Sequence, residues 1–268
     1  MPFLVEQPFR DTAAYFKKND AVVLGVGAIH AHDHIPQGID TLTSEYFVRE
    51  IEKRTEVLVV PTIAYGPMDS YMDYEGCISP RSETFRDYVD QVCMDLYKWG
   101  ARKFFVVNGH SQNQPGLLEV GMKLRRRGGI MPIFEWWRMI QGIDPVLDKA
   151  VNALPEGVDA NRKARTRGTE TAAAMVLVPG AQTPESLKVI YARELFGGAM
   201  RTNFATGLNF KGFVVPTALG SRETTDWGDV GTNATKEMGE QILKKCLDFM
   251  VEFIDHMKKT GVPAFKTT

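Results

Sequence analysis

The chain has 268 residues, 44% of them hydrophobic and 24% charged, which suits one globular domain over residues 1–268 with a substantial core. Its 32 Lys and Arg residues nearly balance its 33 Asp and Glu residues, so the net charge of −1 argues against a nucleic-acid partner or an anionic membrane surface. We therefore expect the partner to be a small molecule.

Neither the start of the chain nor its cysteine content suggests export. Residues 1–7 lack a basic region followed by an apolar run, and no stretch approaches the roughly 18 apolar residues of a membrane span. Cys77, Cys93 and Cys246 are too scattered for a disulfide framework or a C-x-x-C metal site. We expect a soluble, cytoplasmic protein in which cysteine does not hold metal.

Short apolar runs alternate with helical patterns along the first half of the chain. Such runs are typical of strands buried in a parallel sheet. The expected strands cover residues 21–26, 57–60, 104–107 and 130–134, and the expected helices cover residues 43–53, 82–99 and 116–126. This order predicts an α/β fold with three layers, a doubly wound, mostly parallel sheet flanked by helices.

The clearest helical pattern covers residues 82–99, where apolar residues recur at steps of four and three. Ser82 is a suitable N-cap and Gly100 a suitable stop. A last amphipathic helix over residues 234–257 is expected to pack on the sheet. Residues 181–232 are rich in Gly, Thr and Asn, and they predict long loops and short strands around a site or a subunit contact.

Four of the five histidines lie in two short segments that each follow an expected strand. His30, His32 and His34 follow the first strand, and His110 follows the third. These segments share one edge of the sheet, because parallel neighbours end on the same side. Alternation in an extended segment points the first three imidazoles the same way, and Asp40 follows with two oxygens that can bridge two ions. This predicts a metal site, the alternative being histidines that cap loops or form hydrogen bonds in the core.

The same segments resemble motifs of the creatininase (creatinine amidohydrolase) family. The family motifs are G-S-x-E-Q-H-G-P-H-L-P-x-x-T-D, Y-G-x-S-x-E-H-x-x-F-P-G-T-I-S, V-N-G-H-G-G-N, H-A-G-E-x-E-T-S and G-D-P-x-x-A-T-A-E-K-G. The similar segments of this chain are, in the same order, residues 27–40, 65–79, 106–113, 168–172 and 228–239. Five blocks in the right order make the resemblance specific, and it extends over nearly the whole chain. It implies a creatininase-like fold.

The resemblance also implies a centre of two divalent ions, zinc or manganese, in a homohexamer. Family ligands carry over to His32, Asp40 and His110, with Asp40 as the bridge, and a late carboxylate ligand maps to Glu170. His30 stands where the family has its first ligand, a glutamate. The site therefore offers less negative charge, which predicts weaker occupancy by one ion or a more acidic bound water.

A second departure is the loss of the H-A-G histidine, which the resemblance assigns to proton transfer. Arg165, Thr166 and Arg167 stand in its neighbourhood. Asp33 and His34 are the nearest candidates for the general acid or base. The alternative for His34 is a structural role.

Two other groups of residues lie near these motifs. The basic cluster Arg162, Lys163, Arg165 and Arg167 is either a solvated loop or a grip on a carboxylate, on polyol oxygens or on a neighbouring subunit. Trp136 and Trp137 follow the fourth strand, and we expect one in the core and the other at the wall or lid of a pocket.

Together these features predict a hydrolase that uses metal-activated water to attack a carbonyl of a small, polar, cyclic substrate, as a creatininase-like amidohydrolase. An alternative is ring-opening C–C hydrolysis of a keto-inositol of the 3-dehydro-scyllo-inosose type in inositol catabolism. The changes at the first ligand and at the H-A-G histidine argue against creatinine itself. An alternative of another class is a family member that binds metal or ligand without catalysis.

Overall fold

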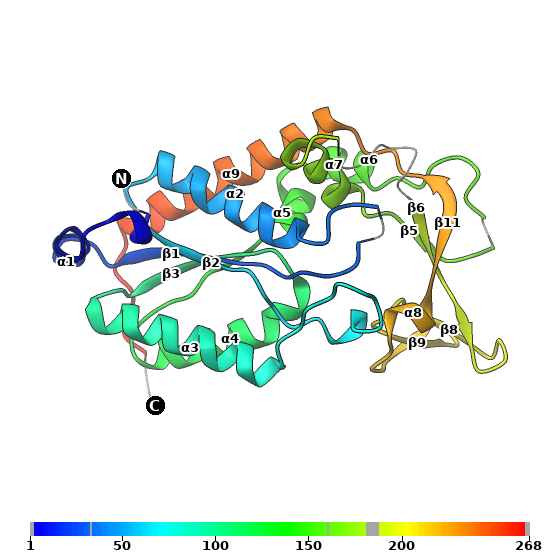
Figure 1. Cartoon of the computed structure of the whole chain (residues 1–268), viewed down its shortest axis with the longest axis horizontal. Helices are drawn as coiled ribbons and strands as arrows, with labels where there is room; N and C mark the ends of the chain where they lie inside the picture. Colours follow the sequence, from blue (N-terminus) through cyan, green and yellow to red (C-terminus); the bar gives the residue numbers. More distant parts are fainter. Residues whose placement is uncertain (1–2, 33, 160, 181–187, 266–268) are drawn as a thin grey trace.

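A four-stranded parallel sheet in the order β2-β1-β3-β4 forms the centre of the molecule (Figure 1). The computed structural model describes residues 3–32, 34–159, 161–180 and 188–265, apart from the side chains of residues 229–230. The strands are β1 Ala21–Val26, β2 Leu58–Ile63, β3 Lys103–Asn108 and β4 Ile133–Glu135. Every residue of β1 and β3 is buried, because helices cover both faces. The strands therefore appear in the sequence as largely apolar runs.

Alternate residues of the central strands enter two separate cores. Val23 and Phe105 belong to one core, and Val22 and Phe104 to the other. The helices around the first core are α2 Ile39–Arg54, α5 Trp136–Ile143, α6 Pro145–Val151, α7 Gly168–Leu177 and α9 Lys236–Lys258. The helices around the second are α1 Phe9–Phe16, α3 Ser82–Trp99 and α4 Gln114–Arg126. This confirms the predicted three-layer, doubly wound α/β fold.

The ends of several elements differ from the prediction. Gly100 ends α3 at a φ of 130°, as expected, but Arg81 is the N-cap residue and Ser82 is already helical. α2 starts at Ile39 rather than near residue 43, so Asp40 lies in its first turn. Near the predicted fourth strand, Ile130 forms only an isolated bridge before β4. Short 3-10 helices cover Leu4–Glu6 (η1), Asp69–Tyr71 (η2) and Ser111–Asn113 (η3).

Residues 188–231, here called the β-extension, form small antiparallel sheets beyond the carboxyl ends of the parallel strands (Figure 1). One sheet contains β11 Thr225–Gly231, β6 Lys188–Ala192 and β5 Ala164–Arg165. The other contains β10 Phe213–Pro216, β9 Gly207–Phe210, β8 Met200–Thr202 and β7 Glu194–Leu195, and the short helix α8 Ser221–Thr224 follows it. Short strands and loops are thus confirmed here, while residues 181–187 lie outside the described residues. No helix in the described ranges has the length and apolar character of a membrane span.

The three cysteines are all free and differ in accessibility. Cys93 and Cys246 are fully buried in the two cores, and burial raises the pKa of each thiol to about 12. Cys77 is partly exposed, and partial burial also raises the pKa of its thiol. The thiolate is the reactive form, so the two core cysteines are inert in the folded protein.

We predict that a thiol reagent at pH 8 modifies one cysteine per folded chain and three after denaturation. At this pH the thiols of Cys93 and Cys246 stay protonated as well as inaccessible, since pH 8 lies far below their raised pKa values. Absorbance titration with Ellman's reagent measures both numbers, and Cys77→Ser should abolish the native signal. Fast modification of Cys93 or Cys246 in the native protein would contradict the packing of both cores.

Candidate metal centre

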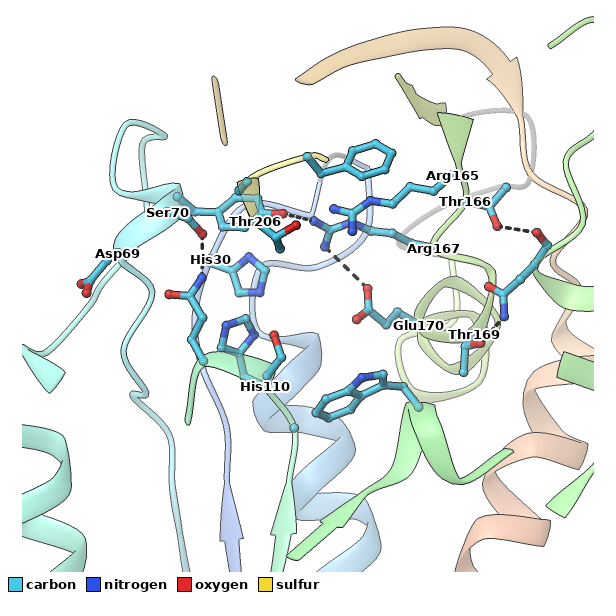
Figure 2. Close-up of a pocket in the computed structure, with 18 of the residues that line it drawn as sticks. His30, Asp69, Ser70, His110, Arg165, Thr166, Arg167, Thr169, Glu170 and Thr206 are labelled. Carbon is cyan, nitrogen blue, oxygen red and sulfur yellow. Dashed lines mark hydrogen bonds and ion pairs between the residues drawn. The ribbon is translucent and has the colours of Figure 1, made fainter. Parts of the chain in front are cut away.

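Five side chains meet at the carboxyl edge of the parallel sheet. Figure 2 labels His30, His110 and Glu170 of this group. His30 and His32 lie in the segment after β1, and His110 follows β3. Asp40 and Glu170 lie in the first turns of α2 and α7, respectively. The topology therefore brings together residues from distant parts of the chain, as the strand order required.

The turn after β3 can approach α2 because residue 109 is glycine. A Cβ atom on Gly109 would lie 2.1 Å from the carbonyl oxygen of Asp40, far inside contact distance. The side-chain oxygen of Asn108 accepts hydrogen bonds from the backbone N–H of His110 at 3.1 Å and from the side chain of Asn113 at 3.0 Å. These contacts fix the turn that presents the His110 imidazole to Asp40.

Asp40 lies at the centre of the group. Its Oδ2 is 3.0 Å from Nε2 of His30 and 2.8 Å from Nδ1 of His110. Its Oδ1 is 3.3 Å from Nε2 of His32, which is 4.0 Å from Oε2 of Glu170. The side chains thus form two donor groups that share Asp40, one with His30 and His110 and the other with His32 and Glu170.

The hydrogen bonds of His30 and His32 define their tautomers. Nδ1 of His30 faces the carbonyl of Ala31 at 2.9 Å, and Nδ1 of His32 faces the carbonyl of His30 at 3.1 Å. A carbonyl can only accept, so each Nδ1 carries a proton. In a neutral ring with this tautomer, Nε2 would keep a lone pair for a metal ion on the side of Asp40.

Burial decides the charge state of the His30 ring. It lowers the pKa of His30 well below the ordinary value of 6.5, and neighbouring His32 lowers it further, so His30 is neutral at pH 7. Burial alone would raise the pKa of Asp40, but the surrounding imidazoles of His32, His30 and His110 hold it well below its usual range. The centre therefore contains an ionised Asp40 carboxylate beside a neutral His30 ring.

This arrangement fits divalent metal ions. Two imidazole nitrogens and two carboxylate oxygens face the same space. A cation between them would be coordinated by the lone pairs of these atoms. Donor atoms about 2.0–2.2 Å from an ion lie roughly 3 Å apart, close to the separations around Asp40. Imidazole and carboxylate donors suit zinc and manganese.

A cavity of about 960 Å³ opens beside the two donor groups. Trp137, Phe204 and Thr206 contribute to its walls, so the β-extension closes one side. Trp136 is 1% exposed and belongs to the core, which agrees with the expected division between the two tryptophans. Arg165 and Arg167 face the cavity, whereas Arg162 and Lys163 of the same cluster are exposed (Figure 2).

The structure does not place all expected site residues together. Asp33 lies outside the described residues. His34 is exposed in the turn after His32, so the shared orientation of the first three histidines holds only for His30 and His32. The chain bends there toward α2, which ends the alternation of an extended segment.

Two cavity residues had no clear signal in the sequence. Tyr71 lies in η2, within a stretch without periodicity, and its ring centroid is 4.9 Å from that of His30. Gln112 lies two residues after His110 and donates to the hydroxyl of Ser70 at 2.6 Å. Gln112 follows the block Asn108-Gly109-His110 in the turn after β3. The position of this turn could have identified Gln112 as a cavity residue, because residues in the turn lie at the same edge of the sheet.

Comparisons with known proteins point to one protein family. A family model described as creatinine amidohydrolase matches residues 6–254. The chain is 25% identical to the creatinine amidohydrolase of Pseudomonas putida over 169 residues, 58% of this chain and 64% of that protein. It is 26% identical to the 3-dehydro-scyllo-inosose hydrolase of Thermotoga maritima over 129 residues, 47% of this chain and 42% of that protein. The chain thus matches less than two thirds of the length of each of these relatives.

Solved creatininase structures share the fold of this chain. A crystal structure of creatinine amidohydrolase superimposes with a TM-score of 0.70 at 21% identity, covering 96% of this chain and 98% of that chain. A manganese creatininase gives a TM-score of 0.71 at 20% identity, covering 96% and 99% of the two chains. A creatininase mutant in a Zn-Zn form gives 0.70 at 21% identity, covering 96% and 98%.

We predict that Asp40→Asn loses most of its bound metal, because Asp40 is shared by both donor groups. Glu170→Gln removes a donor from one group and should keep about half of the wild-type metal content. Mass spectrometry of metals after dialysis against zinc or manganese measures the content per chain. His256→Gln, at the exposed end of α9, is the matched control. Unchanged metal in Asp40→Asn would refute a shared ligand.

Proposed function

The chain belongs to the creatininase family, and we propose that it is a metal-dependent hydrolase that attacks a carbonyl of a small, polar, cyclic substrate. The observation that supports this most is the pair of donor groups that share Asp40 and open to the cavity. We further propose that His30, His32, Asp40, His110 and Glu170 hold two divalent ions, zinc or manganese. Creatininases with manganese and in a Zn-Zn form are known structurally, which supports this choice of metals.

Bound divalent ions would supply Lewis-acid chemistry, making water more acidic and polarising a carbonyl. The residues of the chain would hold the ions in position. Backbone carbonyls fix the tautomers of His30 and His32, and Asp40 supplies the negative charge between them. Nη1 of Arg167 lies 3.5 Å from Oε2 of Glu170 and restrains that carboxylate at the cavity wall.

The proton that the leaving group needs must come from a titratable side chain near the cavity. Gln112 cannot supply it, because an amide does not titrate at neutral pH. We keep Asp33 and His34 as the candidates, since they directly follow His32 in the chain. A shift in the pH profile of kcat in His34→Gln or Asp33→Asn would assign the role.

We propose that the hydrolysed bond is the C–N bond of a cyclic amide, as the match to creatinine amidohydrolase suggests. The second candidate is a ring C–C bond of a keto-inositol, favoured by the match to an inosose hydrolase and implying inositol catabolism. Both reactions begin with attack on a ring carbonyl, so the same centre serves either. A non-catalytic metal-binding protein remains the alternative of another class, and intact His32, Asp40 and His110 argue against it.

We propose that residues 1–268 work as one cytoplasmic domain that assembles into a homohexamer. Three free cysteines suit a reducing compartment. All residues of β10 are exposed, including Phe213, Val214 and Val215, and exposed apolar strands of this kind often mark subunit contacts.

We predict turnover when zinc- or manganese-loaded protein is offered a panel of cyclic amides and 3-dehydro-scyllo-inosose. Asp40→Asn should lower kcat/KM by more than about 100-fold, since even the partners of metal ligands matter by 10- to 100-fold. His256→Gln should retain wild-type turnover. Product analysis by mass spectrometry identifies the bond. Full metal content without turnover of any compound would favour the binding-protein alternative.

We predict that light scattering finds a six-chain assembly and that Phe213→Asp reduces its mass. A charge in a buried apolar contact is strongly unfavourable. Phe9→Asp, on α1 at the opposite end of the sheet, is the control and should leave the assembly intact, although Phe9 is equally exposed at 78%. A monomeric wild-type protein would refute the hexamer.

A further inference from the structure

Two arginines line the cavity beside the candidate metal centre. Arg165 ends β5, and Arg167 directly precedes α7. Among the described residues that line the cavity, they are the only cationic side chains. Figure 2 shows both guanidinium groups on the side of the cavity that faces His30 and Glu170.

Neighbouring side chains hold both arginines in position. Nη2 of Arg167 donates to the hydroxyl of Tyr71 at 2.7 Å, and the Arg167 side chain is only 13% exposed. The guanidinium of Arg165 stacks on Phe204 at 4.3 Å from the ring centroid. A ligand would thus meet groups that are already ordered, which lowers the entropic cost of binding.

The hydrogen bonds and ion pairs of the site leave part of the guanidinium N–H donors of this pair unused. Glu170, the carboxylate paired with Arg167, also belongs to the donor group of His32 and Asp40. Nε of Arg165 and Nε of Arg167 are both buried without a hydrogen-bond partner in the described part of the chain. Burial, with the nearby charge of Arg167, lowers the pKa of Arg165, which shows that the two cations oppose each other.

An anionic ligand group in the cavity would supply a charged acceptor to both guanidiniums. A carboxylate matches the planar fork of a guanidinium and accepts paired hydrogen bonds from it. A neutral ring such as creatinine would offer the two guanidiniums no charged acceptor. Polyol oxygens could accept hydrogen bonds but would bring no charge.

We propose that Arg165 and Arg167 form an anion subsite that binds a carboxylate on the substrate, beside the carbonyl that the metal centre attacks. The anion subsite itself does not depend on the proposed function. Its position beside an attacked carbonyl does rest on that function. The substrate class is therefore a small ring that carries both an attackable carbonyl and a carboxylate.

Calorimetry with two matched probes tests the subsite. The probes are 2-pyrrolidone-5-carboxylate and uncharged 2-pyrrolidone, which differ by the carboxylate. The zinc-loaded protein should bind the carboxylate at least about 10-fold more tightly, as expected for hydrogen bonds to a charged group. The preference should persist after EDTA treatment, because it resides in the arginines. Equal affinities, or a preference that vanishes with the metal, would overturn the proposal.

Variants of Arg165 test whether the preference for the carboxylate probe depends on this arginine. Arg165→Gln should remove most of the preference for the carboxylate probe, and Arg165→Lys, which keeps the positive charge, should retain part of it. Arg162→Gln is the matched control, since Arg162 pairs with Asp226 on the exposed side of the same segment. A preference unchanged in both Arg165 variants would overturn the proposal.

Two further outcomes separate related possibilities. Competition by inorganic phosphate that exceeds competition by the carboxylate probe would show a phosphate subsite and overturn the choice of carboxylate. Tight, arginine-dependent binding of the carboxylate in a protein that hydrolyses no compound of the panel would support the subsite while refuting the proposed hydrolase.

Discussion

The buried carboxylate of Asp40 is the interaction on which the site depends. Three imidazoles from two strand-end segments surround it, and α2 carries it in a first turn that the Gly109 contact holds against the sheet. Burial of an ionised carboxylate is costly, and a cation bound among the carboxylate and imidazole donors would offset that cost. The fold around Asp40 is thus arranged for positive charge, and metal binding should be coupled to the order of these segments.

Two changes relative to the family motifs alter the charge of the cavity in the same direction. His30 stands where the resemblance has a glutamate, and Arg165 and Arg167 stand near the missing histidine. Each makes the surroundings of a bound ligand more positive. A negatively charged substrate would restore the balance, which connects the altered ligand set to the arginine pair and to a chemistry other than that of creatinine.

The sequence predicted the parts of the protein that repeat a simple pattern. β1 and β3 are apolar because they are buried on both faces, and the strand-end positions of His32 and His110 followed from parallel order. The early start of α2 was missed, because Asp40 is an ordinary first-turn residue with no distinctive cap. Tyr71 and Phe204 could not be found, since they reach the cavity from irregular segments whose tertiary placement has no period. The bend at His34 was missed because alternation assumes a straight chain.

The centre and the cavity wall are built on different kinds of structure. The donor residues lie in segments anchored to a buried sheet, whereas Phe204 and Thr206 come from the β-extension, in which β9 and β10 have four residues each and β10 is fully exposed. Substitutions in the extension would therefore leave the donor atoms around Asp40 in place, whereas substitutions near Asp40 would displace them. The shape of the cavity can thus change independently of the donor groups.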